Sequence, residues 1–257
     1  LPAMDRAGIQ ARIDDLLEWL ADLDQIRFDL MRGDDRYDYA VLEYGIRSEL
    51  LGLEETRDWA NDPGLYTDLI GRGLDAVVVR EYEPFNVRAG AITGRLRAAA
   101  GLLEAAQENV SRPPRIWTEM ASQDARGLVE YLERDLPAKL AEQTARVPQE
   151  LEQARARLVA ELEAHVAWLD GELHPRSTGT YRLGRYLLER KLLYEEHISL
   201  SLEELERLNL DAINRYRQEM DFTAREIDTS RPYQAIVDSL AAVGPARGAR
   251  EPVAADR

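Results

Sequence analysis

The stretch PAKLAEQTARVPQELEQARARLVAELEAHVAWL, residues 137–169, decides the fold class. One stripe of side chains in it recurs every three to four residues, which is the repeat of a single face of an α-helix. The stripe consists of Leu140, Thr144, Val147, Leu151, Ala154, Leu158, Leu162, His165 and Leu169. The near-heptad repeat lasts only about four heptads and includes polar members, so packing inside a domain is favoured over a free coiled coil. We expect one long central helix that Pro137 can begin and that Pro148 kinks near its start.

The same periodicity continues on both sides of this stretch. Further helices are expected over about residues 5–30, from about 36 to 59, as short helices within 65–83, over 84–109, 117–134 and 181–197, from 201 to about 227, and in a last short helix ending near 240. Ser201 with Glu204 three residues on predicts a capping box. The β-branched run at 76–79 leaves one strand as an alternative, but no neighbouring segment alternates with period two to pair with it. The chain is predicted to be all-α, a helical array of about eight to ten antiparallel helices.

The domain organisation follows from where apolar side chains stop. A chain of 257 residues could form one large or two small domains. We expect one helical domain over residues 1–243. Residues 244–257 are rich in Ala, Arg, Gly and Pro and have almost nothing to bury, so they are predicted to form a disordered tail.

Composition excludes several classes of function. The chain has 48 acidic and 33 basic residues, a net charge of −15, which repels phosphates and anionic lipid headgroups, so nucleic acid binding is not expected. No apolar run approaches the ~18 residues of a membrane span. The absence of cysteine excludes disulfides, thiolate metal sites and cysteine nucleophiles. Because the chain starts at Leu1 without a signal-type segment, localisation stays open between a cytoplasmic protein and a trimmed secreted one.

The histidines lack the neighbouring residues, at the required spacing, that metal binding or catalysis needs. His165 lies on the apolar stripe and is expected in the core or at its boundary, while His174 and His197 are expected at helix ends. Gly71 begins a Gly-x-Gly-x-x-Ala match, but it lacks a preceding strand and is interpreted as an ordinary segment. No nucleophile elbow and no phosphate-binding loop occurs. We therefore predict no catalytic, cofactor-binding or metal-binding residues in this chain.

Four side chains are candidates for lining a substrate cleft. Arg88 and Arg95 are seven residues apart on one helix face and could hold a carboxylate; the alternative is ion pairing within the protein. Tyr181 and Tyr186 could present their hydroxyls to a substrate; the alternative is that they close the wet edge of a core.

Several landmarks recur in a defined order along the chain. They are Trp59 with Asp62-Pro63-x-x-Tyr66, Arg88, Arg95-Leu96, Pro113-Pro114, Gly179-x-Tyr181, Leu183-Gly184, Glu203-Glu204-Leu205 and Glu219-Met220. Together they resemble the amino-terminal half of the bacterial family called domain of unknown function 885, over about residues 5–243. Asn209 departs from the pattern, in which we expect a glycine.

Members of that family resemble helical zinc metallopeptidases, with ligands expected in a His-Glu-x-x-Pro-Gly-His stretch of the carboxy-terminal half. No such stretch occurs here. The resemblance therefore implies a non-catalytic helical half of a zinc-dependent, peptidase-like hydrolase, which provides scaffold and one wall of the substrate cleft. Zinc would belong to the missing half, and this chain alone is expected to be inactive. The expected partners are that missing half or a second copy, with a peptide as substrate of the full-length protein.

Two other classes of function stay open. The chain could be a stand-alone helical interaction or scaffold module without enzymatic activity, or one subunit of a split enzyme. A half-enzyme should expose an apolar face where its other half docks and should therefore aggregate or dimerise. An interaction module should do neither until its partner is added.

Overall fold

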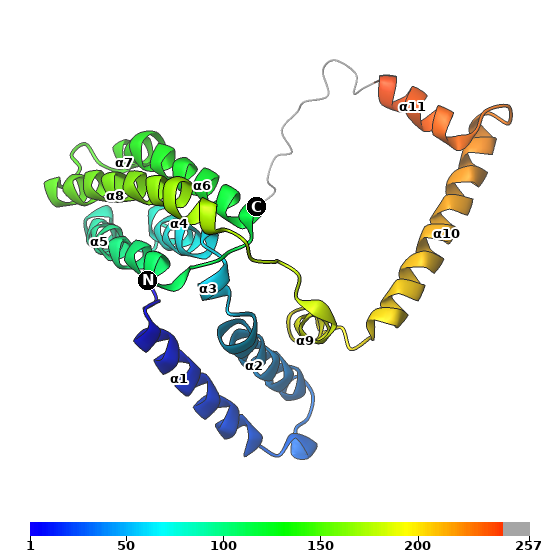
Figure 1. Cartoon of the computed structure of the whole chain (residues 1–257), viewed down its shortest axis with the longest axis horizontal. Helices are drawn as coiled ribbons and strands as arrows, with labels where there is room; N and C mark the ends of the chain where they lie inside the picture. The colour runs from blue at the N-terminus through cyan, green and yellow to red at the C-terminus, as the bar shows by residue number, and fades with distance from the viewer. Residues whose placement is uncertain (244–257) are drawn as a thin grey trace. The chain divides into compact units, whose positions relative to one another are not determined.

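Four helices form the main core of the first part of the chain in the computed structural model, which describes residues 1–243 (Figure 1). They are α4 (Gly64–Val78), α5 (Phe85–Asn109), α6 (Arg115–Glu130) and α8 (Gln149–Trp168). Each turns a stripe of Leu, Ile, Val and Ala inward, and these stripes share one continuous core. All regular structure in the described residues is helical, which confirms the all-α prediction and removes the strand alternative at 76–79.

A small network of hydrogen bonds connects the start of the chain to this core. Tyr66 is fully buried, and its hydroxyl donates to the carbonyl of Trp59 at 2.6 Å. Asn109, at the end of α5, donates from Nδ2 to the Tyr66 hydroxyl at 2.9 Å and to the carbonyl of Met4 at 2.7 Å. A buried hydroxyl without partners would cost free energy, so these bonds fix both segments against the core.

Helices α1 (Arg6–Asp24) and α2 (Asp35–Leu50) build a second, smaller core with α3 (Asp58–Asn61). Arg12, in the first half of α1, pairs with Glu49, at the end of α2, so this pair of helices runs antiparallel. Figure 1 shows the two helices side by side. The first helix is shorter than predicted, because Asp24 ends it and a separate 3-10 turn, Phe28–Leu30, follows.

The predicted long helix over 137–169 is wrong in its length. The segment forms two helices, α7 (Leu136–Gln143) and α8. Thr144 is extended at φ −152° and ψ 142°, and Pro148 stands before α8 at φ −59° and ψ 136°. Proline lacks an amide hydrogen and disfavours helical geometry in the preceding residue, which is compatible with the break found here in place of the predicted kink.

Other boundaries differ by less. Residues 65–78 belong to one helix, α4, instead of several short ones, and its Val77 and Val78 are buried. Single π-helical turns continue three helices, over Leu51–Thr56, Tyr131–Asp135 and Leu169–Leu173. A 3-10 turn, His174–Arg176, follows the last of them, and α9 is Gly184–Glu196.

The chain divides into two compact units, Leu1–Ile198 and Ser199–Arg257. The described part of the second unit consists of α10 (Leu202–Ile227) and α11 (Tyr233–Val243), which contact each other. The predicted capping box is confirmed, since Ser201 and Glu204 exchange hydrogen bonds at the start of α10. The predicted tail, 244–257, lies outside the described residues.

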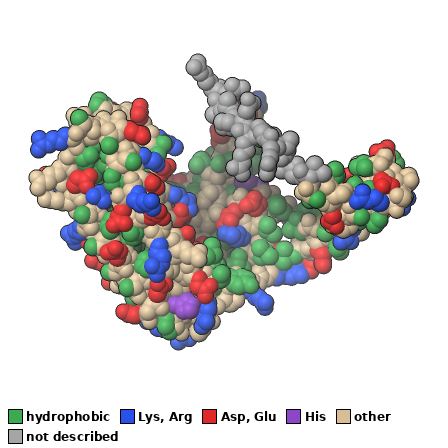
Figure 2. Space-filling model, turned by 90° about the horizontal axis from the view of Figure 1, so that it is seen from above, with side chains coloured by type: hydrophobic (Ala, Val, Ile, Leu, Met, Phe, Trp, Pro, Cys, Tyr) green, Lys and Arg blue, Asp and Glu red, His purple; other side chains and the backbone are tan. Residues whose placement is uncertain are grey.

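Charged side chains of both signs are interspersed on the face that Figure 2 presents. Many of them pair one helical turn apart, as Arg157 does with Glu161 at 2.7 Å. Exposed pairs of this kind contribute little to stability, typically below ~1 kcal/mol each. The fold therefore depends on its apolar cores and on its few buried polar groups.

Candidate functional site

The two arginines predicted to line a cleft both donate hydrogen bonds to backbone carbonyls of α4, and Arg88 also lines a cavity of about 530 Å³ with Phe85 and Gln143. Arg88 is buried, and its guanidinium donates to the carbonyls of Val77, Val78 and Glu83 and to Oε1 of Gln143. These bonds satisfy carbonyls at the carboxyl end of α4, where a cation is favoured. Arg95 donates to the carbonyl of Gly73 on the same helix. Both arginines therefore hold α5 against α4.

The two tyrosines keep their side chains exposed, at 59% for Tyr181 and 64% for Tyr186. Tyr181 lines a cavity of about 490 Å³ together with Pro114 and Glu119. The hydroxyl of Tyr186 accepts a hydrogen bond from Arg190, whose guanidinium also pairs with Glu55. The structure therefore places Tyr186 at the contact between α9 and the π-helical turn Leu51–Thr56. Tyr186 does not line the cavity that Tyr181 lines.

The three histidines lie where the sequence indicates. His165 is 1% exposed in the core. His174 follows a helical turn and pairs with Glu119 at 3.2 Å, and His197 ends α9 in the left-handed conformation at φ 56°. Within residues 1–243, no three His, Cys, Asp or Glu side chains lie close enough together to hold a metal ion.

The main candidate for a binding site is a cavity of about 650 Å³ between α1, α2, α3 and α4, here called the α1–α3 cavity. Its walls are mostly apolar, and Glu195 of α9 also lines it. The main apolar lining residues are Met4, Ile9, Leu53, Trp59, Leu65 and Leu69. This volume lies within the range of ~300–1,000 Å³ that is typical of small-molecule sites.

Irregular backbone shapes one wall of this cavity. The π-helical turn Leu51–Thr56 ends at Arg57, a non-glycine residue in the left-handed region at φ 52° and ψ 51°. The Trp59 indole donates to the carbonyl of Leu53 at 2.8 Å, and Asn61 donates to the carbonyl of Thr56 at 2.8 Å. Both π-turns and left-handed non-glycine residues concentrate at functional sites, because regular helix would be more stable there.

Carboxylates dominate the charges around the cavity. Arg12 makes a bidentate pair with Glu49 at 2.6 and 2.7 Å, and this pair, with Asp15 near it, raises the pKa of Arg12. Asp15, Asp58 and Glu195 also line the cavity. Four carboxylates therefore face one guanidinium, which is already neutralised by one of them.

Asp58 is shared with a neighbouring cavity of about 370 Å³, which Asp62, Asp68, Asp124 and Arg72 also line. Burial raises the pKa of Asp62, against the opposing effect of a hydrogen bond from the Gly64 amide. The acidic character therefore extends from the α1–α3 cavity into the next depression.

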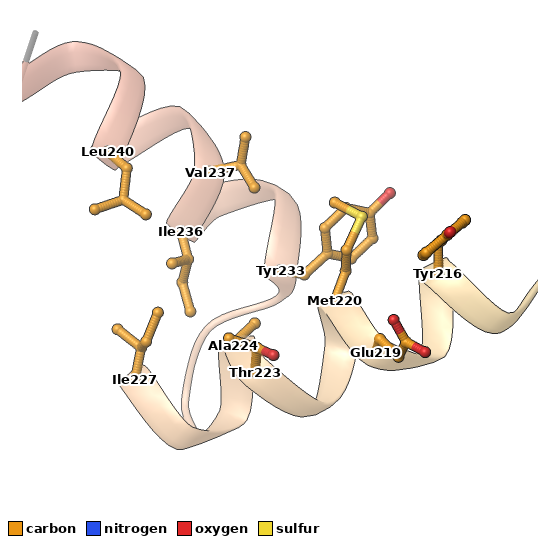
Figure 3. Close-up of a pocket in the computed structure, with 10 residues that line it drawn as sticks. All are labelled: Tyr216, Glu219, Met220, Thr223, Ala224, Ile227, Tyr233, Ile236, Val237 and Leu240. Carbon is orange, nitrogen blue, oxygen red and sulfur yellow. The ribbon is translucent and has the colours of Figure 1, made fainter. Parts of the chain in front are cut away.

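The second unit carries a groove of about 350 Å³ between α10 and α11 (Figure 3). Ile227 from α10 faces Ile236 and Leu240 from α11, Met220 lies next to Tyr233, and Tyr216 lines the groove further along α10. Although α10 is 26 residues long, Ala224 is its only buried residue within the described part of the chain. The groove is open and apolar, which is the character of a contact surface.

Reasoning from sequence missed the α1–α3 cavity. Its lining comes from five helices and a π-turn that are separated in sequence, and periodicity does not reveal how such segments converge. The local signal available was the sequence Asp58-Trp59 directly after a helix break, and Asn61-Asp62-Pro63-Gly64 a few residues later.

Fold and sites together define an all-α protein with an acidic, apolar-walled cavity in one unit and an open apolar groove in the other. The chain belongs to the family described as bacterial protein of unknown function (DUF885), whose model matches residues 1–254. No curated protein matches the chain.

A solved structure described as "a putative lipoprotein of unknown function from Shewanella oneidensis" shares the fold, with a TM-score of 0.77 at 19% sequence identity. The similarity covers 88% of this chain and 42% of that chain. This chain therefore spans less than half the length of the solved relative. No helix in residues 1–243 is long and apolar enough to cross a membrane.

Proposed function

We propose that this chain is the non-catalytic helical half of a longer, zinc-dependent, peptidase-like hydrolase, in which it provides scaffold and one wall of the substrate cleft. The observation that carries the proposal is the apolar face of α10, left uncovered in a chain that spans 42% of its solved relative. A face of this kind is the contact expected between two halves of one protein.

The pattern of α10 supports this assignment. A single stripe, with helical spacing, contains Leu205, Leu208, Ala212, Ile213, Tyr216, Met220, Thr223 and Ile227. Tyr216 is 55% exposed and Ile227 is 59% exposed. Apolar surface that faces water is unfavourable by roughly 25 cal/mol per Å², so a partner surface over the exposed part of this stripe is favoured.

The chemistry would belong to the other half. In a zinc peptidase the metal polarises the carbonyl and activates water, which requires a ligand set that residues 1–243 do not form. Within this chain, Tyr181 is the side chain best placed to face a peptide, because it is exposed and lines a cavity.

The test is to read the coding frame beyond codon 257 and to express both the 257-residue chain and any longer product. We expect the longer product to contain a His-Glu-x-x-Pro-Gly-His stretch, to retain zinc and to hydrolyse peptides, and the 257-residue chain to do neither. Stoichiometric zinc in the purified 257-residue chain would contradict the proposal.

A second candidate function is a stand-alone interaction module that uses the same α10 face. The groove between α10 and α11 is the observation that favours it. A stop codon after codon 257, with no neighbouring gene that encodes the zinc-binding stretch, would favour this candidate.

A further inference from the structure

We propose that the α1–α3 cavity binds a small amphiphile, a molecule with an apolar body and one protonated amine. The cavity lies within the first unit, so binding there is independent of the longer-protein proposal. The volume of the cavity, the chemistry of its walls and the sign of the charge around it support this ligand class.

The apolar walls of the cavity favour a ligand with an apolar body. Trp59 and Leu65 line the cavity from the core side, and Met4 and Ile9 line it from the start of the chain and α1. The one polar group of the Trp59 side chain is already bonded to the carbonyl of Leu53. A ligand that enters this part of the cavity therefore finds dispersion contacts and apolar surface instead of hydrogen-bond partners.

The carboxylates that line the cavity favour a positively charged group on the ligand. Among residues 1–243, Arg12 is the only basic residue that lines the cavity, and Glu49 occupies its guanidinium with two hydrogen bonds. Lys191 pairs with Glu195 at 2.5 Å. Asp15 and Asp58 remain, and no hydrogen bond or ion pair within residues 1–243 neutralises either carboxylate. An anionic ligand would have to break the Arg12 pair, whereas an ammonium group adds a partner to a carboxylate.

Asp58 is the carboxylate best placed to meet the amine. It starts α3 directly after the left-handed Arg57, so the backbone turns sharply there. Its Oδ2 lies 3.8 Å from the position that a β-carbon on Gly52 would occupy, and Gly52 itself lines the cavity. The π-helical turn and the left-handed residue together bring the carboxylate to the apolar wall.

The experiment is isothermal titration calorimetry on the whole chain, with n-octylamine below its micelle concentration and 1-octanol as the neutral probe of equal length. We expect octylamine to bind about tenfold more tightly than octanol, and its affinity to fall as salt rises. Equal affinities for the two probes, or no heat from either up to the solubility limit, would overturn the proposal.

Variants assign the binding to the cavity. Asp58→Asn should lower octylamine affinity about tenfold and leave octanol affinity unchanged, and Asp15→Asn should lower it less. Asp14→Asn is the matched control, because Asp14 lies on the same helix as Asp15 without lining the cavity. Ala11→Trp, which places a large side chain in the cavity, should abolish binding of both probes.

Folding of each variant is checked by circular dichroism. If Asp58→Asn does not fold, Asp15→Asn and Ala11→Trp decide the question. Wild-type octylamine affinity in both of these folded variants would overturn the proposal, and so would an equal loss in Asp14→Asn.

Discussion

At the scale of single residues, His165 is the group with the least favourable surroundings. It is 1% exposed, its ring packs 5.2 Å from Trp168, and neither ring nitrogen has a hydrogen-bond partner within residues 1–243. Burial lowers the pKa of His165 to about 4. Its stripe position was enough to predict a core histidine, but the missing partners could not be predicted, because they depend on which helices surround the stripe.

The lowered pKa of His165 predicts a dependence of stability on pH. In the unfolded chain the His165 imidazole takes up a proton near pH 6.5, whereas in the folded chain it is protonated only near pH 4. The unfolded state therefore binds more protons between these values, and stability falls as pH falls through this window. The loss reaches about 3 kcal/mol at pH 4, at 1.36 kcal/mol per pKa unit.

The measurement is denaturant unfolding at pH 7 and at pH 4 for the wild type and for His165→Leu. The variant should lose about 3 kcal/mol less between the two pH values, since carboxylate titration is common to both proteins. His197→Asn is the control, because asparagine also tolerates the left-handed conformation and the buried imidazole stays. An equal pH dependence in the wild type and His165→Leu would refute this account.

Arg88 predicts a second effect at this scale. Its guanidinium satisfies three backbone carbonyls and Gln143, and its side chain is buried. Arg88→Leu leaves these acceptors unpaired, so we expect a loss of about 3 kcal/mol in the free energy of unfolding. Arg97 lies on the same helix as Arg88 and makes an exposed ion pair with Glu150 of α8. Arg97→Leu should lower the free energy of unfolding by less than about 1 kcal/mol. Chemical denaturation distinguishes the two, and similar losses would contradict a special role for Arg88.

At the scale of elements, periodicity identified the helices of the main core because each of them buries one face. Val77 and Val78 illustrate this, since they are β-branched and yet lie on the buried face of α4. The break between α7 and α8 was expected only as a kink. Pro148 could begin a new helix or bend an old one, and the extended conformation of Thr144 decides between them. That choice is made by packing with other helices, which a local pattern does not contain.

The start of α10 provides a prediction for an element. Ser201 Oγ accepts a hydrogen bond from the Glu204 amide, and the Glu204 carboxylate accepts one from the Ser201 amide at 2.9 Å. The Ser201 amide, together with the Ser201 hydroxyl that donates to the same carboxylate at 2.8 Å, lowers the pKa of Glu204. Ser201→Ala should cost about 1 kcal/mol, which raises amide hydrogen exchange in the first turn of α10 about fivefold. Ser201→Asp should keep wild-type exchange, and unchanged exchange in Ser201→Ala would show that the cap does not hold the turn.

At the scale of the whole molecule, the two units differ in how far they bury their own apolar surface. The first unit has two apolar cores, and the second has only Ala224 and Ile236 buried among the described residues of its helices. The sequence predicted that a half-protein would leave an apolar face exposed, but which helix carries it depends on what packs nearby. The candidate cavity in the first unit also arises at this scale, from segments far apart in the chain.

The exposed stripe of α10 predicts how the purified chain behaves. In the 257-residue chain alone, we expect concentration-dependent self-association and binding of an apolar dye, because water contact with the stripe is unfavourable. Met220→Glu, in the groove at 43% exposure, should reduce both. Phe222→Glu adds the same charge to the same helix at a residue that is 66% exposed and does not line the groove, so it should leave both unchanged.

Light scattering after size exclusion, over a hundredfold range of concentration, measures the association. If both variants behave like the wild type, association does not use the α10 stripe. If both reduce association equally, general charge repulsion explains the effect and the stripe has no special role. If the wild type stays monomeric and binds no dye, the stripe is already covered, and α10 cannot be the face that another half of the protein contacts. Only a loss confined to Met220→Glu supports α10 as that contact face, because this variant changes the stripe and its control does not.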